Sequence, residues 1–265
     1  MPDVAWQRRG RVRIDTTVDG HVHTKLCKHA TGEMEEYVQA AVAKGLTGII
    51  FLEHLESGIS YFESTWLSEA EFDLYFAEGL RLRQKYAGQI TVGLGVEVGY
   101  NPHKVAAIAD FLARHVWDRV GLSCHFLETS GDHLNLVSRR QSNWGPLGEL
   151  GMDKVVAIYF QRLRQAVEEL PGTVVCHLDA VLRHHPDIRF TAENRQLALA
   201  VLNAMAERGL ALEVNTSGFP HRGEPYPDSF FRDEAVRRGI QLVPGSDAHQ
   251  PRDVGRYFER LATWP

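Results

Sequence analysis

The chain has 265 residues, of which 44% are hydrophobic, so it is long enough to bury one sizeable core. The formal net charge is −5 and no run of basic residues is visible, which argues against a dedicated nucleic-acid partner. No apolar stretch approaches the roughly 20 residues of a membrane span, and residues 1–14 lack the apolar centre of a signal peptide, so we expect one cytoplasmic domain with no membrane partner.

Short β-branched segments alternate with longer segments of helical periodicity along the chain. The predicted strands are residues 16–18, 48–52, 90–96, 119–123, 173–176, 210–214 and 241–244. The predicted helices are residues 34–44, 69–86, 105–114, 155–170, 192–208 and 230–238. Residues 126–151, rich in Gly, Ser, Asn and charged side chains, are interpreted as a long loop. Seven strands in alternation with helices predict an α/β fold with a parallel sheet, as in a (β/α) barrel.

Histidines and acidic residues recur at the ends of these predicted strands. In chain order the strand ends carry His21 with His23, then His54, Glu97, His125, His177, Asn215, and Asp247 with His249. The carboxyl ends of all strands of a (β/α) barrel open on one face, so these side chains are expected to converge on one site. Imidazole nitrogens and carboxylate oxygens together suit zinc, iron or manganese. The sequence therefore predicts a metal site at the mouth of the barrel.

The densest part of this pattern is the segment His21-x-His23-x5-His29. Residues two apart on a strand point to the same side, so His21 and His23 can hold one ion together. His29 lies further along the loop and could reach a neighbouring ion. Glu97 lies between the flanking histidines in chain order and could bridge two ions at the short separation of two-metal phosphatases.

The other histidines and the cysteines are given ordinary structural interpretations. The six histidines outside the strand-end pattern are His103, His115, His133, His184, His185 and His221. The three cysteines, Cys27, Cys124 and Cys176, include no CxxC pair. Adjacent strand residues face opposite sides, so if His125 and His177 face the site, Cys124 and Cys176 are expected to face the helices.

With these residues in place, the chain resembles the polymerase and histidinol phosphatase (PHP) family from about residue 18 to residue 254. The resemblance implies a distorted, seven-stranded, TIM-barrel-like domain, here one phosphoesterase domain over residues 1–265, with a trinuclear metal site at the carboxyl ends of the strands. Nine positions match the ligand pattern of the family: His21, His23, His29, His54, Glu97, His125, His177, Asp247 and His249.

The resemblance also implies how these ligands are shared among three divalent ions, which zinc, iron or manganese could supply. The first ion would be held by His21, His23, Glu97 and Asp247, the second by Glu97, His125 and His177, and the third by His29, His54 and His249. One departure is Glu53, where the family more often has Asp. We expect this change to alter the support of His54 without the loss of a metal.

Several segments resemble the histidinol-phosphate phosphatase branch of the family in particular. They are HTKLCKHA (residues 23–30), SCHF (123–126), HLD (177–179), EVNTSG (213–218), EPYP (224–227) and PGSDAH (244–249). The implied reaction is hydrolysis of L-histidinol phosphate, a small phosphate ester, to L-histidinol and phosphate in histidine biosynthesis. A hydroxide between two metals, with its pKa lowered to about 7, would attack the phosphorus.

Two arginines are candidates for binding the substrate phosphate, because a guanidinium can bind phosphate through two parallel hydrogen bonds. They are Arg183, after HLD, and Arg222, after NTSG, and the resemblance favours Arg183. Asp247 and His249 are the candidates for protonating the leaving alkoxide. Both are also expected metal ligands, so the general acid stays open.

Three other functions are compatible with the pattern. The chain could be a PHP phosphoesterase for nucleotides, nucleic-acid ends or sugar phosphates, or a metal-binding protein without turnover. A metal-dependent amidohydrolase also has an HxH after its first strand, but such enzymes often use a bridging carbamylated lysine, and no lysine lies at the end of the fourth predicted strand here. The sequence leaves the physiological metals and the oligomeric state open.

Overall fold

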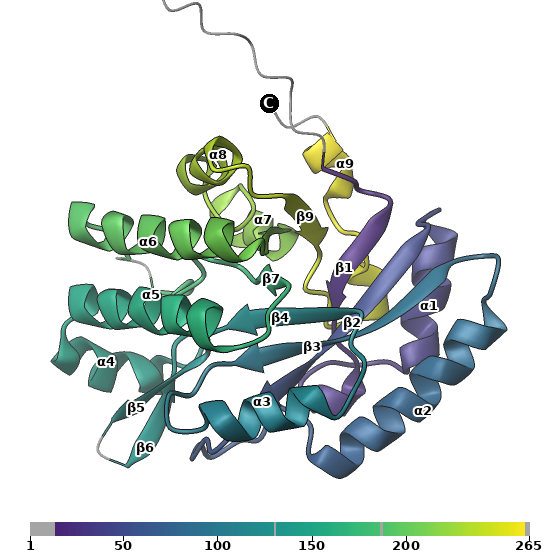
Figure 1. Ribbon diagram of the computed structural model, residues 1–265, viewed down its shortest axis with the longest axis horizontal. Coiled ribbons are helices and arrows are strands. Elements are labelled where there is room, and N and C mark those ends of the chain that lie inside the picture. Colours follow the sequence, from purple (N-terminus) through teal and green to yellow (C-terminus); the bar gives the residue numbers. More distant parts are fainter. Residues whose placement is uncertain (1–13, 130, 186–187, 263–265) are drawn as a thin grey trace, which may run out of the picture.

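Seven parallel strands form a nearly closed barrel in the computed structural model, which describes residues 14–129, 131–185 and 188–262 (Figure 1). In sheet order the strands are β1 (Val18–Val22), β2 (Gly48–Glu56), β3 (Thr91–Gly99), β4 (Arg119–Ser123), β7 (Val174–Val175), β8 (Ala211–Asn215) and β9 (Leu242–Gly245). This confirms the expected α/β barrel. Within the described residues no helix is long and apolar enough to cross a membrane.

Helices follow the strands and surround the barrel (Figure 1). They are α1 (Met34–Ala43), α2 (Glu69–Lys85), α3 (Val105–Ala113), α4 (Trp144–Leu150), α5 (Met152–Glu169), α6 (Ala192–Arg208), α7 (Phe219–Arg222), α8 (Ser229–Arg237) and α9 (Phe258–Ala262). Local sequence sets their ends. Ser68 caps α2 with a capping box to Glu71, and Gly209 ends α6 with a left-handed φ of 72°.

The barrel closes where β1 meets the end of β9. His23 N donates to the carbonyl of Ala248 at 2.9 Å, and Asp247 N donates to the carbonyl of His21 at 2.9 Å. Asp19, which is fully buried, accepts hydrogen bonds from Ser246 N at 2.9 Å and from Gly255 N at 2.7 Å. This seam brings the first and last predicted metal ligands of the chain side by side.

Alternation along β3 divides the core into an outer and an inner part. Val92, Leu94, Val96 and Val98 belong to the large hydrophobic cluster that also contains the buried faces of the helices. The intervening residues face the interior of the barrel: a side chain at Gly95 would collide with Leu52 of β2. Small residues on β3 therefore leave room for larger inward side chains from the neighbouring strands.

Leu52, Val174 and Cys176 form a separate buried cluster inside the barrel, which we call the apolar plug. The side chain of Cys176 also lies against Gly121. The expectation that Cys176 faces the helices is therefore wrong. The reason is that β7 ends at Val175 and His177 adopts a left-handed φ of 28°, so strict alternation does not extend through these residues. Cys124 does belong to the outer cluster, as expected.

The structure also corrects the extent of the first three strands. The first strand covers residues 18–22 instead of 16–18, and β2 and β3 extend to residues 56 and 99. His21, His54 and Glu97 therefore lie within strands, not after them. The backbone ladder continues past these polar residues, as the pairing of His54 with Glu97 in the register of β2 and β3 shows.

The segment of residues 126–151 is more ordered than a long loop. It contains an antiparallel hairpin, β5 (Phe126–Thr129) and β6 (Asp132–Asn135), followed by a 3-10 turn and α4. The hairpin is fastened to the loop after β2, because His133 N donates to the carbonyl of Ser60 at 2.9 Å and Ser60 N donates to His133 Nδ1 at 3.1 Å. Each strand is short, so its alternation was too weak to predict.

Candidate metal centre

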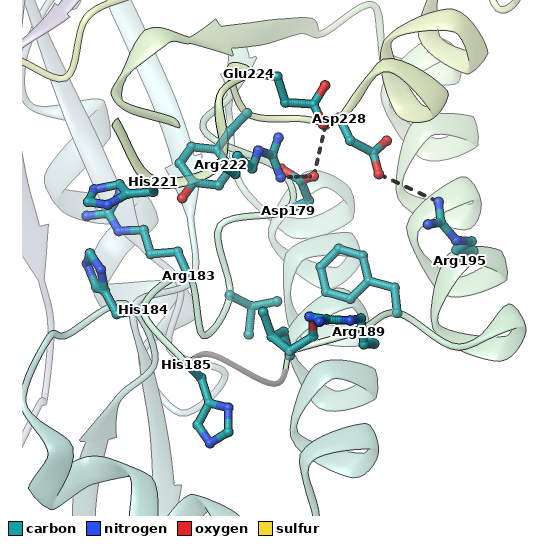
Figure 2. A pocket seen from close by; sticks show the side chains of 14 residues that line it. Asp179, Arg183, His184, His185, Arg189, Arg195, His221, Arg222, Glu224 and Asp228 are labelled. Carbon is teal, nitrogen blue, oxygen red and sulfur yellow. Dashed lines mark hydrogen bonds and ion pairs between the residues drawn. The ribbon is translucent and has the colours of Figure 1, made fainter. Parts of the chain in front are cut away.

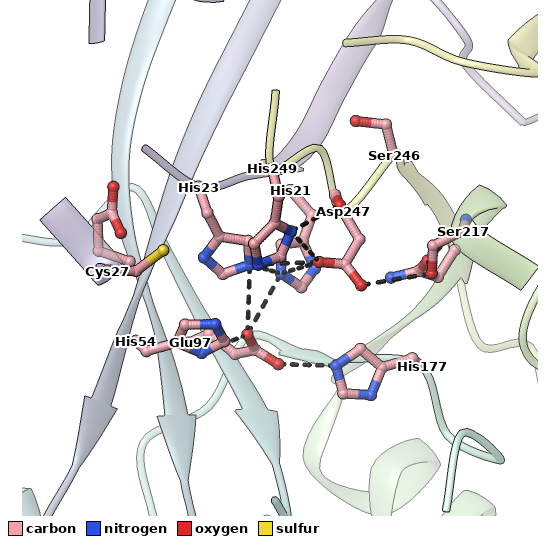
Figure 3. Close-up of polar contacts among 12 residues, drawn as sticks. His21, His23, Cys27, His54, Glu97, His177, Ser217, Ser246, Asp247 and His249 are labelled. Atoms are coloured by element: carbon pink, nitrogen blue, oxygen red, sulfur yellow. Dashed lines mark hydrogen bonds and ion pairs between the residues drawn. The ribbon is translucent and has the colours of Figure 1, made fainter. Parts of the chain in front are cut away.

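The nine predicted ligands converge at the carboxyl ends of the strands, on one side of the apolar plug. Figure 3 shows His21, His23, His54, His177, Asp247 and His249 around the carboxylate of Glu97. They come from β1, β2, β3, the end of β7 and the loop after β9. The expected convergence is therefore present in the structure, whereas the role of each residue toward a metal remains a prediction.

Glu97 lies at the centre of this group, and its two carboxylate oxygens face different histidines. Oε2 lies 3.0 Å from His54 Nδ1, 3.4 Å from His21 Nε2 and 3.6 Å from His23 Nε2. Oε1 lies 2.8 Å from His177 Nε2 and 3.1 Å from His125 Nε2. Although burial opposes ionisation, the histidines hold the pKa of Glu97 well below its usual range. This arrangement suits a carboxylate that bridges two ions.

Asp247, in the loop after β9, also lies close to His21 and His23. Its Oδ1 lies 3.4 Å from His23 Nε2 and 4.0 Å from His21 Nε2. The backbone of Asp247 is in the left-handed region, with a φ of 51°, and its N–H is bonded to the carbonyl of His21. The turn after β9 thus directs the carboxylate toward the two histidines of β1.

His249 lies between two overlapping groups of possible ligands. Its ring nitrogen is within 4.8 Å of ligand atoms of His23 and His54 in one group, and of Cys27 and His29 in the other. His249 Nε2 and His29 Nε2 are 2.8 Å apart, and the rings of His29 and His54 have centroids 5.3 Å apart. The three residues predicted for the third ion therefore lie close together, and Cys27 belongs to one of the two groups that share His249.

The inward nitrogens of His21 and His125 are available as electron-pair donors, because the outer nitrogen of each ring has a carboxylate partner. His21 Nδ1 lies 2.6 Å from Glu213 Oε1, and His125 Nδ1 lies 2.7 Å from Glu56 Oε1. Such partners fix the ring and direct Nε2 to a metal. Although burial opposes protonation, Glu97 and Glu56 raise the pKa of His125 to about 10, so this part of the site favours a positive charge, and a metal ion at Nε2 would take the place of the proton there.

His29 and His249 show the same orientation with backbone partners. The Nδ1 of His29 lies 3.0 Å from the carbonyl of Cys27, and that of His249 lies 3.0 Å from the carbonyl of Asp247. Burial lowers the pKa of His29 to about 4 and that of His249 to about 3, so both rings are neutral at pH 7. Two electron pairs that face each other at 2.8 Å repel unless a cation joins them. The donor set therefore fits divalent metal ions.

The sequence interpretation missed two buried carboxylates that orient these histidines. Glu213 accepts from His177 N at 2.9 Å and from Asn215 Nδ2 at 3.0 Å, besides its contact with His21. Glu56 is the partner of His125. Strand alternation could have found both, because Glu56 comes two residues after His54 and Glu213 two residues before Asn215.

Glu53 supports a different residue from the one that we expected. Its Oε1 accepts hydrogen bonds from Thr24 N at 2.8 Å and from Thr24 Oγ1 at 2.6 Å. Glu53 and His54 are adjacent strand residues and face opposite sides of the sheet. The carboxylate of Glu53 therefore fixes the turn after His23, and the expected support of His54 is corrected.

The two candidate arginines occupy different environments. Arg183 borders both a cavity of about 70 Å³ at the histidine cluster and a neighbouring cavity of about 530 Å³, and its Nη1 lies 3.6 Å from Asp247 Oδ2. Arg222 donates from Nη1 to Asp179 Oδ2 at 2.8 Å (Figure 2). Its guanidinium carbon lies 4.1 Å from the centroid of the Tyr226 ring. Arg183 is thus at the rim of the metal centre, whereas Arg222 is held by a carboxylate in the wall of the larger cavity.

The six remaining histidines have other surroundings. His184 and His221 form an edge-to-face pair in the wall of the larger cavity, and His115 stacks on Phe76. His103 Nε2 lies 3.2 Å from Glu128 Oε2 near the surface. Within residues 14–129, 131–185 and 188–262, none of the six belongs to a group of three possible metal ligands. Their ordinary structural interpretation is retained.

Comparisons with known proteins agree with this geometry. The sequence profile of the PHP domain family matches residues 19–217. A "Probable histidinol-phosphatase" of Deinococcus radiodurans is 34% identical over 244 residues, which covers 91% of this chain and 89% of the relative. The histidinol-phosphatase of Bacillus subtilis strain 168 is 29% identical over 261 residues, which covers 91% and 96%.

Two solved structures share the fold at lower sequence identity. A Listeria monocytogenes protein, provisionally described as a histidinol phosphatase, superposes with a TM-score of 0.83 at 22% identity, over 92% of this chain and 99% of that one. The histidinol phosphate phosphatase of Lactococcus lactis, complexed with zinc, L-histidinol and phosphate, has a TM-score of 0.70 at 20% identity, over 94% of both chains. From the profile match and the relative at 34% identity, we conclude that the chain belongs to the PHP domain family.

Proposed function

We propose that the protein is a metal-dependent phosphatase that hydrolyses L-histidinol phosphate to L-histidinol and inorganic phosphate. The observation that carries the proposal is the position of Glu97, whose two oxygens face two sets of histidines beside the guanidinium of Arg183. Relatives named histidinol-phosphatase at 29% and 34% identity support the choice of substrate. The Lactococcus lactis protein of the same fold carries zinc, histidinol and phosphate in its structure.

The metal part of the proposal has three divalent ions. His21, His23, Glu97 and Asp247 would hold the first, Glu97, His125 and His177 the second, and His29, His54 and His249 the third. Zinc, iron and manganese all accept this donor set. When bound, such ions lower the pKa of water so that a nucleophile exists at neutral pH, and they neutralise charge on the phosphoryl oxygens.

The protein groups around the ions would bind and orient the ester. Arg183 borders the small cavity at the histidine cluster, where a phosphate dianion would receive hydrogen bonds from its guanidinium. Asp247 and His249 are the candidates for returning a proton to the leaving alkoxide, because Asp247 is the predicted ligand that contacts Arg183 and His249 adjoins it. Arg222 is already paired with Asp179, so we assign it to the structure of the cavity wall.

The neighbouring cavity of about 530 Å³ offers space for the alcohol part of the substrate. Arg183 lines both cavities, so an ester whose phosphate lies at the ions can extend past this arginine. The carboxylates of Asp179, Glu224 and Asp228 line the larger cavity, where a ligand with a protonated amine would compete with the arginines that already pair with them, Arg222, Arg232 and Arg195. L-histidinol has such an amine beside its imidazole ring.

The test is release of inorganic phosphate by the metal-reconstituted protein from L-histidinol phosphate, beside nucleotides and sugar phosphates. We expect selective release from L-histidinol phosphate that a chelator abolishes and that added zinc or manganese restores. Preference for another ester would overturn the substrate and leave the metal chemistry. No release from any ester with zinc, manganese or iron would overturn the enzymatic function.

A further inference from the structure

We infer that the sulfur of Cys27 is a further ligand of the third metal position, together with His29 and His249. This inference rests on the metal centre of the proposed function and is independent of the substrate. It adds a thiolate to a site that the sequence pattern builds from imidazoles alone. Such a donor changes which metals the position prefers.

Three possible metal ligands, one thiol and two imidazoles, lie close together. The sulfur of Cys27 and one ring nitrogen each of His29 and His249 all lie within 4.8 Å of one another. Zinc binds thiolate sulfur at about 2.3 Å and imidazole nitrogen at about 2.0 Å, so donors with this spacing need only small shifts to share one ion. Figure 3 shows the side chain of Cys27 directed toward the histidine group.

The chain around Cys27 holds it in this position. The 3-10 turn Lys25–Cys27 ends at Lys28, whose left-handed φ of 68° reverses the chain between Cys27 and His29. Burial raises the pKa of the Cys27 thiol, whereas hydrogen bonds from the backbone N–H groups of His29 and Ala30 to the sulfur lower it and hold the sulfur in place. Thr31 N donates to the carbonyl of His249 at 2.9 Å and fastens this loop to the one that carries His249.

The other two cysteines provide the comparison. Cys124 lies in the outer hydrophobic cluster, without a place in the described groups of possible metal ligands. Cys176 lies near His21 and Glu213, but the His21 nitrogen in that group is already hydrogen-bonded to the carboxylate at 2.6 Å. Cys27, in contrast, lies in one group with His29 and His249, whose Nε2 atoms are 2.8 Å apart.

A thiolate at this position predicts a difference among the three ions. Soft sulfur ligands favour zinc, cobalt or ferrous iron, whereas sites built from oxygen accept manganese readily. The third ion would therefore be exchanged for manganese less readily than the two ions bound by Glu97. The thiol proton is released to solvent when the ion binds.

The test is the absorption spectrum of the cobalt-loaded protein, with Cys27→Ser and the matched control Cys124→Ser. We expect a near-ultraviolet charge-transfer band from thiolate to cobalt in the wild type and in Cys124→Ser, and its loss in Cys27→Ser. Titration with cobalt should show that Cys27→Ser changes the affinity for one ion only. Absence of the band in the wild type, or its persistence in Cys27→Ser, would overturn the inference.

A second measurement needs no substitution and covers the case in which Cys27→Ser fails to fold. X-ray absorption of the zinc-loaded wild type should reveal a sulfur neighbour at about 2.3 Å beside the nitrogen and oxygen neighbours. A spectrum with only nitrogen and oxygen neighbours would reject Cys27 as a ligand. Neither measurement depends on hydrolysis, so a failure of the histidinol phosphate assay would leave the result for Cys27 unaffected.

Discussion

The two ends of the barrel interior are built from the same strands but have opposite chemistry. In the apolar plug, Leu52 and Cys176 fill space that the glycines of β3 and β4 leave open. One inward position further along β2 and β3 the residues are His54 and Glu97, which lie side by side, with Glu97 buried and the His54 side chain 12% exposed. Along β2, the boundary between the part that stabilises the barrel and the part that carries candidate metal ligands thus lies between Leu52 and His54.

This difference indicates in which part of the barrel the burial of side chains requires positive charge from bound ions. Burial of the plug is favourable without any partner, because apolar surface is removed from water. Burial of Glu97, Asp247 and Glu213 at the mouth is costly unless positive charge lies beside them. Substitutions in the plug should therefore change stability, and substitutions at the mouth should change metal binding and turnover.

The largest expected effect is that of Glu97→Gln, which keeps the size of the side chain and removes its charge. Because Glu97 faces histidines of both predicted ion sites, we expect loss of at least one bound ion and of nearly all turnover. Metal analysis by mass spectrometry and the phosphate-release assay measure this. Full metal content with unchanged turnover would show that Glu97 is not the bridge.

The next effect is on stability, in the plug. Leu52→Ala should lower the free energy of unfolding by about 2–5 kcal/mol, because it leaves a cavity in a fully buried cluster. Metal content of the folded protein should not change. Denaturant unfolding of the metal-loaded protein measures this, with Leu74→Ala as the control, since Leu74 is 63% exposed and should change stability by less than about 0.5 kcal/mol. A metal loss in Leu52→Ala would contradict the separation of the two halves.

Substitutions of Arg183 and Arg222 test the different roles of the two arginines near the candidate metal centre. Arg183→Ala should lower kcat/KM by an amount equivalent to about 1.5–3 kcal/mol, the value of a hydrogen bond to a charged group, without loss of metal. Arg222→Ala should instead lower stability, because the buried carboxylate of Asp179 loses its positively charged partner and keeps only the hydrogen bond from Asp228 N. Kinetics and unfolding of both variants separate the roles, and the reverse pattern would exchange the two assignments.

The smallest expected effect is on metal affinity, when a carboxylate that orients the predicted ligands is replaced. Glu213→Gln should weaken metal binding by about 10–100-fold, because His21 and the backbone of His177 lose the carboxylate that orients them. Competition with a chelator of known affinity measures this. Glu169→Gln is the control, since Glu169 is bonded to the hydroxyl of Tyr100. Equal affinity in Glu213→Gln and the wild type would remove Glu213 from the metal centre.

Much of this fold follows from local patterns in the sequence. The predicted strand at residues 119–123 and the predicted helix at residues 192–208 have the observed bounds, because apolar runs and helical periodicity are clear there. The convergence of eight of the nine predicted ligands followed from their places at strand ends, since barrel topology brings these ends together, and His29 was placed near them by the loop after the first strand.

Other features depend on tertiary contacts that one sequence does not display. Alternation can place Glu56 and Glu213 on the inner side of their strands, but only the closed barrel shows that their partners are His125 and His21. Apolar patterns stop at buried polar residues, so β2 and β3 were predicted too short. Arg183 and Arg222 differ only in what lies next to them, which no local pattern encodes.

At His177 and Asp247, the left-handed backbone conformation lowers stability, while the side chains belong to the candidate metal centre. With φ values of 28° and 51°, both are conformations that glycine adopts at little cost and other residues adopt only when the surroundings enforce them. Selection for stability alone would place glycine at each turn, but glycine has no imidazole or carboxylate. Part of the stability of the barrel is thus given up so that two turns can carry chemistry.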